Sequence, residues 1–263
     1  MKIRWPAAAA AALLCAPAGE ARAQIDYRNL DDDRPALVED AYPIERYAFE
    51  LLFPWSSSRE RGAAATHGSV LELAYGFALG AHAGLKLPLA SDAGGGNRRW
   101  GISGLRAFVL YNFNTEGPAL PALSARVDGH FPVGSLGGDA TRAEFKVIGT
   151  RTFGRARLHL NAAVGLGPDA AGPALEGAPR WWYGAALDRV FFRQSLLLVA
   201  EVYARRERRG DAVEVNASLG ARWQWTPTLV LDAGVTRRLR ATGPDYGVTA
   251  GVSHAFALAG LMP

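Results

Sequence analysis

The chain has 263 residues, a formal net charge of +4, a sequence pI near 9.4 and 49% hydrophobic residues. After the N-terminal leader, no stretch approaches the ~18 uncharged apolar residues of a membrane helix, which excludes a helical membrane protein. The sole cysteine, Cys15, lies in the leader, which excludes disulfides, cysteine–zinc sites and cysteine nucleophiles elsewhere. Basic residues are spread along the chain, which argues against nucleic-acid binding.

The first 23 residues have the pattern of a secretory signal peptide. Lys2 and Arg4 supply the positive start, residues 7–16 form a short apolar core, and Ala21-Arg22-Ala23 provides a small-x-small cleavage site. We therefore predict export and cleavage after Ala23. Lipidation of Cys15 is the alternative, but a leucine precedes it where lipoprotein processing requires a small residue.

Residues 24–45 show no strand alternation. The run Asp31-Asp32-Asp33 and the prolines Pro35 and Pro43 make this stretch polar and irregular. We predict a periplasmic N-terminal segment that could plug the domain that follows.

From residue 46 to residue 256 the hydropathy alternates with a period of two. The range 213–225 shows it best: its odd positions are all apolar, and its even positions are all polar or glycine. Such alternation is typical of a strand with lipid on one side and a lumen on the other. Twelve such strands are predicted, at 47–53, 71–75, 79–87, 105–113, 123–131, 144–147, 157–164, 181–188, 196–203, 213–225, 228–236 and 246–256.

These strands predict an all-β fold, a transmembrane up-and-down antiparallel β-barrel of about twelve strands, with ten or fourteen as alternatives. Residues 257–263 follow as a C-terminal tail. Abundant glycine and proline, 30 and 15 residues, suit many turns. A soluble β-sandwich would explain the alternation alone, but not the signal peptide, the loop lengths and the aromatic positions together.

The predicted connections alternate between long and short, as in outer-membrane barrels with long outside loops and short periplasmic turns. The longer connections are at 54–67, 88–101, 132–141, 166–180 and 236–245, with intermediate ones at 114–121 and 205–212. The short turns are at 76–77, 153–154, 192–193 and 226–227. With both termini in the periplasm, the long connections lie outside, and we predict localisation in the outer membrane.

Two sets of side chains are candidate functional residues. The first is an aromatic girdle at the membrane interfaces: Trp55, Trp181, Tyr183, Trp223, Trp225, Tyr246 and Phe256. The second is ionisable and has inward parity, because charges cannot face lipid cheaply. Its members are predicted to line the lumen and set its selectivity: Glu72, Lys86, Arg106, Arg126, Asp128, Lys146, Arg157, Glu201, Arg222 and Asp232.

An enzymatic function is disfavoured. Some outer-membrane barrels of this size are lipases that use Ser and His on the lipid-facing wall. Here His254 has outward parity, but Ser253 beside it points inward, and no Gly-x-Ser-x-Gly motif occurs. The five histidines lack close ligand spacing, so we predict no metal and no cofactor.

Several strand motifs resemble the outer-membrane transporters grouped as the meta-pathway of phenol degradation family. They are Gly101-Ile102-Ser103-Gly104-Leu105-Arg106 with Tyr111-Asn112, Leu158-His159-Leu160-Asn161, and the runs 197–203, 222–234 and 243–253. The resemblance covers roughly residues 45–256 and implies a barrel of about twelve strands that takes up small, aromatic compounds. Two features depart from the family: Ser103-Gly104 replaces the expected Gly-Asp pair, and the chain continues past Phe256.

The leading functional hypothesis is an outer-membrane channel for passive passage of small molecules, aromatic compounds among them, without covalent chemistry. The expected partners are outer-membrane lipid, lipopolysaccharide, the barrel-assembly machinery and small solutes. The runner-up is a closed structural or surface-interaction barrel. A lipid hydrolase is third.

Overall fold

The computed structural model describes residues 26, 28–32, 34–92, 99–168, 179–191, 195–241 and 243–261. The predicted signal peptide lies outside these ranges. No helix in the described part of the chain is long and apolar enough to span a membrane. The strands, in chain order, are β1 (Ala48–Arg59), β2 (Thr66–Ala78), β3 (Ala81–Asp92), β4 (Arg99–Ile102), β5 (Leu105–Asn114), β6 (Ala122–Phe131), β7 (Arg142–Phe153), β8 (Ala156–Leu166), β9 (Trp181–Phe191), β10 (Leu196–Arg206), β11 (Glu214–Thr226), β12 (Leu229–Arg240) and β13 (Tyr246–Ala257).

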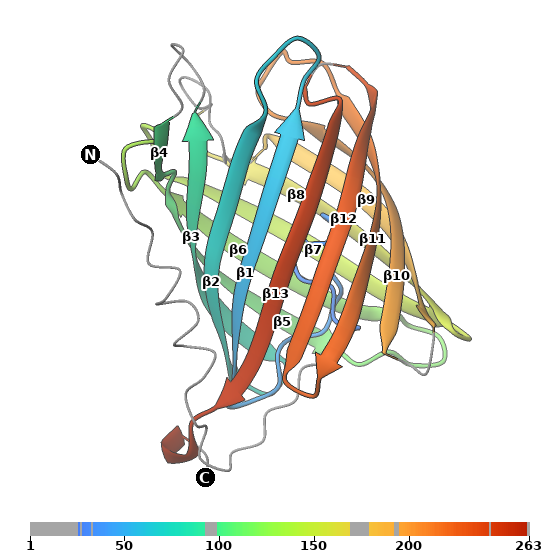
Figure 1. Ribbon diagram of the computed structural model, residues 1–263. Helices are drawn as coiled ribbons and strands as arrows, with labels where there is room; N and C mark the ends of the chain where they lie inside the picture. The colour runs from blue at the N-terminus through green and yellow to red at the C-terminus, as the bar shows by residue number, and fades with distance from the viewer. Residues whose placement is uncertain are drawn as a thin grey trace.

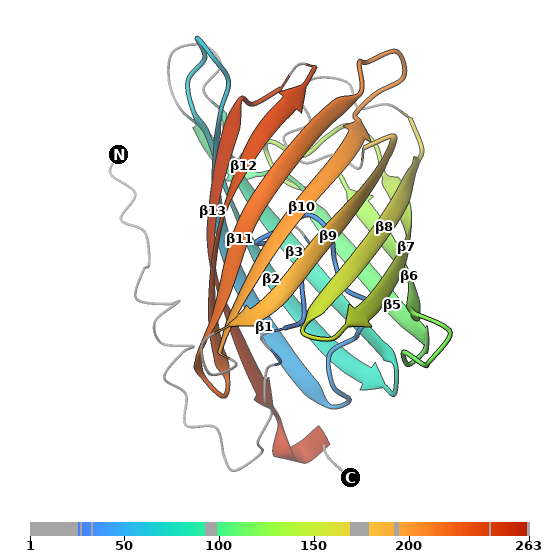
Figure 2. The same cartoon turned by 90° about the vertical axis from the view of Figure 1, so that its right-hand side faces the viewer.

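The strands form one closed antiparallel sheet, a tilted barrel in both views (Figures 1 and 2). Apart from β4, each strand pairs with the strands before and after it, and β1 closes the barrel by pairing with β13 along its whole length. The short strand β4 pairs with the end of β3, while β5 pairs with its beginning. The two therefore share one strand position, and the predicted count of twelve is confirmed.

The interruption between β4 and β5 falls at Ser103-Gly104. Gly104 has a φ of 143°, a backbone conformation that favours glycine. The strand β4 was not predicted, because the range 88–101 carries no clear alternation. It forms by backbone pairing with the end of β3, which needs no apolar face.

The predicted parity is confirmed along the barrel. Outward side chains are apolar and exposed, such as Leu71 at 44%, Val127 at 52% and Leu219 at 63%. Inward neighbours such as Glu72 and Asp128 are buried. A belt of exposed apolar side chains around a closed barrel is the surface of a transmembrane β-barrel.

The connections alternate in length as predicted, but several long ones are shorter than predicted. β1 runs to Arg59 and β2 starts at Thr66, so the first long connection is 60–65 rather than 54–67. β12 runs to Arg240, well into the predicted connection 236–245. The strands continue because backbone pairing persists in polar sequence, as between 56–58 and 247–249. We call the end with turns 79–80, 154–155 and 227–228 the short-turn end.

The described residues between 26 and 46, named here the N-terminal segment, run inside the barrel and are drawn in blue in Figures 1 and 2. Leu30, Val38 and Ala41 are at most 2% exposed. The segment is a hairpin, because the amide of Asp40 donates to the carbonyl of Leu30 at 3.2 Å. Its tip, near Pro35, contacts the middle of β11 and β12.

Both ends of this hairpin lie at the short-turn end. The guanidinium of Arg157, the second residue of β8, donates to the carbonyl of Arg28. At the other end, the amide of Tyr47 donates to the carbonyl of Gly76 at 2.6 Å, near the turn 79–80. Tyr47 has a φ of 69°, where the chain leaves the lumen and enters β1. The segment thus enters and leaves through the same mouth.

Candidate functional site

The ten predicted lumen residues all lie on the inner wall. Eight are buried, and Arg106 and Arg157 are partly buried. The structure brings most of them together around the N-terminal segment rather than around an open water-filled passage. Their part in selectivity stays a prediction.

The backbone of the descending arm, residues 37–41, is held by side chains of the wall. The carboxylate of Glu201 accepts from the amides of Leu37 and Val38, both at 2.9 Å. Asn161 accepts from the amide of Glu39 at 2.9 Å and donates to its carbonyl at 2.8 Å. Because buried backbone groups must find partners, inward polar side chains here replace the partner strand that the arm lacks.

The same arm continues to a second set of wall contacts. Thr150 accepts from the amide of Ala41 at 2.9 Å. The carbonyl of Ala41 accepts from Asn112 at 2.8 Å and from Ser124 at 2.5 Å. Five strands therefore bond the backbone of residues 37–41: β5 through Asn112, β6 through Ser124, β7 through Thr150, β8 through Asn161 and β10 through Glu201.

Two carboxylates of the segment contact three cations of the wall. Asp32 lies 2.5 Å from Lys146, 3.1 Å from Lys86 and 3.4 Å from Arg126. Glu39 lies 2.8 Å from Arg126 and 3.1 Å from Lys146. We call Lys86, Arg126 and Lys146 the cationic cluster. All three are at most 2% exposed, so each needs a counter-charge in this conformation.

Further ion pairs hold the tip and the base of the N-terminal segment. Asp31 lies 2.6 Å from Arg222, and Arg34 lies 3.4 Å from Asp232. Near the short-turn end, Arg157 pairs at 2.5 Å with Asp188 of the wall and at 3.4 Å with Asp40 of the segment. Ion pairs with the wall therefore hold the segment at its tip, in its middle and at its base.

Apolar contacts complete the fit. Leu30, Ala36 and Val38 pack in one cluster with inward side chains of the wall, among them Trp182, Leu197 and Val230. Ala41 packs with Leu110 and Ile148 in a second cluster. These inward apolar residues were not predicted, because the sequence pattern assigns apolar side chains to the lipid face. They face inward because the segment, not water, fills this part of the lumen.

Inward glycines make room for the segment. A Cβ on Gly220 would lie 2.6 Å from the Cβ of Pro35, and one on Gly184 would lie 2.8 Å from Cγ2 of Val38. A Cβ on Gly251 would lie 2.7 Å from Arg34. The inner wall is therefore complementary to the hairpin in shape as well as in charge.

Gly220→Val is therefore expected to displace the hairpin tip without harming the strand, because β-branched residues suit strands. Overpacking costs roughly 1–3 kcal/mol, so hydrogen–deuterium exchange of residues 36–42 should rise about tenfold. Gly149→Val is the matched control, because Gly149 faces outward and a Cβ there has nothing nearer than 3.7 Å. Equal exchange in both variants would show that the glycine is not needed for docking.

The predicted girdle residues all face outward. Trp55, Trp181, Tyr183 and Tyr246 lie toward the long-loop end, and Trp223, Trp225 and Phe256 lie toward the short-turn end. Neighbouring rings contact each other, as in the pair Trp181–Tyr183 with ring centroids 5.6 Å apart. Two outward groups of aromatic side chains at opposite ends are the arrangement expected of interfacial girdles, which stays the predicted role.

The structure does not join the residues considered for hydrolysis. His254 faces outward and stacks on Phe256, with ring centroids 6.1 Å apart. Ser253 faces inward and is fully buried. The two side chains lie on opposite faces of β13, so they form no Ser–His dyad.

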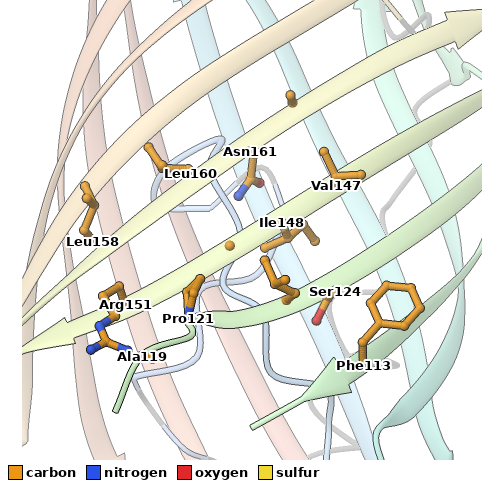
Figure 3. A pocket seen from close by; sticks show the side chains of 13 residues that line it. Phe113, Ala119, Pro121, Ser124, Val147, Ile148, Arg151, Leu158, Leu160 and Asn161 are labelled. Carbon is orange, nitrogen blue, oxygen red and sulfur yellow. The ribbon is translucent and has the colours of Figure 1, made fainter. Parts of the chain in front are cut away.

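A hollow of about 700 Å³ lies outside the lumen, on the wall formed by β6, β7 and β8 (Figure 3). Its apolar lining includes Leu123, Val147 and Leu160, which are outward and exposed. Pro121 and Arg151 border it at the short-turn end. Because it opens on the lipid-facing side, it belongs to the membrane-contacting surface and not to the lumen site.

No protein-family model and no curated protein matches the sequence. Solved structures match in fold. The COG4313 outer membrane channel from Pseudomonas putida F1 superimposes with a TM-score of 0.64 at 16% identity, over 82% of this chain and 98% of that chain. The KdgM porin in complex with disordered oligogalacturonate gives 0.55 at 10% identity, over 80% and 99%. The NanC porin gives 0.55 at 9% identity, over 78% and 98%.

At these identities the likeness shows the fold alone, which is that of porin-like outer-membrane β-barrels. The resemblance to the meta-pathway of phenol degradation family is not matched by a family model and stays a prediction.

Proposed function

We propose that this chain is an outer-membrane channel for small solutes, and that its N-terminal segment closes the lumen from the periplasmic side. One observation carries the proposal: the lumen is filled by a hairpin held largely through ion pairs and side-chain hydrogen bonds, as between Asp32 and Lys146. Such contacts can be exchanged for water, so withdrawal of the hairpin leaves a charged, hydratable passage. No covalent chemistry is required.

The barrel size and its neighbours support this function. A barrel of eight strands is filled by its own side chains, whereas sixteen strands leave an aqueous channel, and twelve lie between. The wall alone does not fill this barrel, because the segment occupies the remainder. Two of the solved neighbours are named as porins and one as an outer membrane channel.

The remaining parts of the proposal follow from the sequence and the fold. We propose export through a signal peptide cleaved after Ala23, insertion by the barrel-assembly machinery, and an outer wall in contact with membrane lipid and lipopolysaccharide. The solutes are proposed to be small molecules, aromatic compounds among them. Arg106 and Asp128 lie in the long-loop half of the wall and are proposed to line the outer vestibule.

A closed structural barrel is the second candidate. It is favoured by ion pairs that the wall makes with itself, such as Glu72 with Lys86 at 3.1 Å and Arg126 with Asp128 at 2.8 Å. In that case the hairpin is a permanent core, and the outside loops carry the function.

Planar-bilayer conductance separates the two candidates. The chain without residues 26–45 is expected to give discrete conductance steps, and the full chain to give them much more rarely. Heat-modifiable electrophoretic mobility serves as the control for folding of both forms. If both forms are folded and neither gives conductance steps, the result would contradict the channel and support the closed barrel.

A further inference from the structure

The cationic cluster contains like charges that face each other directly. Arg126 of β6 and Lys146 of β7 are cross-strand partners in the register. Like charges opposite one another destabilise a sheet unless an anion lies between them. Asp32 and Glu39 of the N-terminal segment each contact both cations. The wall contributes Asp128 of β6, which contacts Arg126.

The three cations differ in what the wall itself offers them. Lys86 has Glu72, and Arg126 has Asp128. Both carboxylates that contact Lys146, Asp32 at 2.5 Å and Glu39 at 3.1 Å, belong to the segment. When the segment leaves, Lys146 loses both of these partners, and the place between Lys146 and Arg126 becomes an anion-binding site.

Two aromatic rings border the same place. The guanidinium of Arg126 lies 3.9 Å from the ring centroid of Phe108, and Nζ of Lys146 lies 5.2 Å from the ring centroid of Trp182. Phe108 and Trp182 are both 3% exposed inside the barrel. If the carboxylate group of a solute binds to these cations, the apolar part of the same solute can pack against the two rings.

We propose that the cationic cluster is the solute-binding site of the lumen, and that it takes small organic carboxylates with an apolar body. This inference rests on the proposed channel function and names its substrate class. In the closed conformation Asp32 and Glu39 occupy the site as internal carboxylates. An external carboxylate competes with them for Lys146 and Arg126 and thereby shifts the population toward the withdrawn segment.

Hydrogen–deuterium exchange of residues 36–42 in the full chain tests the inference without requiring conduction. The amides of Leu37, Val38, Glu39 and Ala41 are bonded to wall side chains and should exchange slowly while the hairpin is docked. Sodium benzoate is expected to raise their exchange about tenfold over sodium chloride at equal ionic strength. Benzyl alcohol, with the ring but without the carboxylate, should have no effect.

Variants at Lys146 assign the effect to the cluster. Lys146→Met should show fast exchange without benzoate and no further response, because the segment carboxylates have lost this partner. Lys146→Arg keeps the charge and should retain the benzoate response. An equal benzoate effect in Lys146→Met, or none in the unmodified chain, would overturn the inference.

Conductance recorded under the same conditions keeps the two proposals distinguishable. Benzoate-dependent exchange in a protein that never conducts, even without residues 26–45, would support the carboxylate site and contradict the channel. If the chain without residues 26–45 conducts but benzoate does not change the hydrogen–deuterium exchange of the full chain, the result would support the channel and contradict the carboxylate site.

Discussion

Replacing Asp32 by Asn and Glu39 by Gln in one chain is expected to release the N-terminal segment from the lumen. Lys146 is 0% exposed and would lose the charge on both carboxylates that contact it. Removing one partner of a buried ion pair costs roughly 3–5 kcal/mol, which is a shift of ~100-fold or more between closed and open populations. Bilayer recordings should therefore show conductance steps as frequent as those of the chain without residues 26–45.

The double replacement has a matched control on the exposed surface. Asp26 pairs with Arg28 where both side chains are more than one-third exposed, and Glu60 is exposed in the connection 60–65. Asp26→Asn with Glu60→Gln makes the same chemical changes at exposed positions, where ion pairs are worth at most about 1 kcal/mol. The control should behave as the unmodified chain. A double replacement that stays as silent as its control would show that charge does not hold the hairpin.

A disulfide between the segment and the wall is expected to lock the lumen closed. In Val38→Cys with Gly184→Cys, a Cβ at position 184 would lie 2.8 Å from the Cγ2 position of residue 38. In a disulfide, the Cβ of one cysteine lies ~3 Å from the sulfur of the other, as its bond lengths require. The predicted mature chain has no other cysteine, so no competing pair exists. The oxidised protein should be silent in bilayers, and reduction should restore the steps.

The lock is most informative when it is added to Asp32→Asn with Glu39→Gln. Oxidation should then suppress frequent steps in a single preparation, and each single-cysteine variant should not respond to oxidant. Conductance that is unchanged by a disulfide shown to be complete would mean that solutes pass without movement of the hairpin.

The wall of the barrel could be predicted from the sequence because lipid imposes a strict rule on it. Every second side chain between residues 213 and 225 must be apolar, and the rule gives both the strand and its inward face. Connection lengths then fixed the orientation of the strands. Strand ends were less predictable, since pairing continues in polar sequence such as Ser56–Ser58, where no alternation marks it.

The filling of the barrel could not be predicted in the same way. The N-terminal segment has no periodicity, because its backbone bonds to side chains such as Glu201 and Asn161 instead of to a regular neighbour. Its acidic run beside proline marked it as an irregular segment that could plug the barrel, but indicated neither its hairpin shape nor the wall residues that it contacts. The wall offered one usable signal: Arg126 and Lys146 share inward parity on neighbouring strands, and such a pair requires an anion from elsewhere.

The way the hairpin enters the barrel has a consequence for the cost of opening. Both ends of the hairpin lie at the same mouth of the barrel. It can therefore move out through that mouth as one unit, without the chain passing through the lumen to the other end. The strand-to-strand hydrogen bonds that close the barrel, including those of β1 with β13, need not break during this movement. Opening and unfolding are thus separate processes, and a change that frees the hairpin should leave the heat resistance of the barrel largely intact.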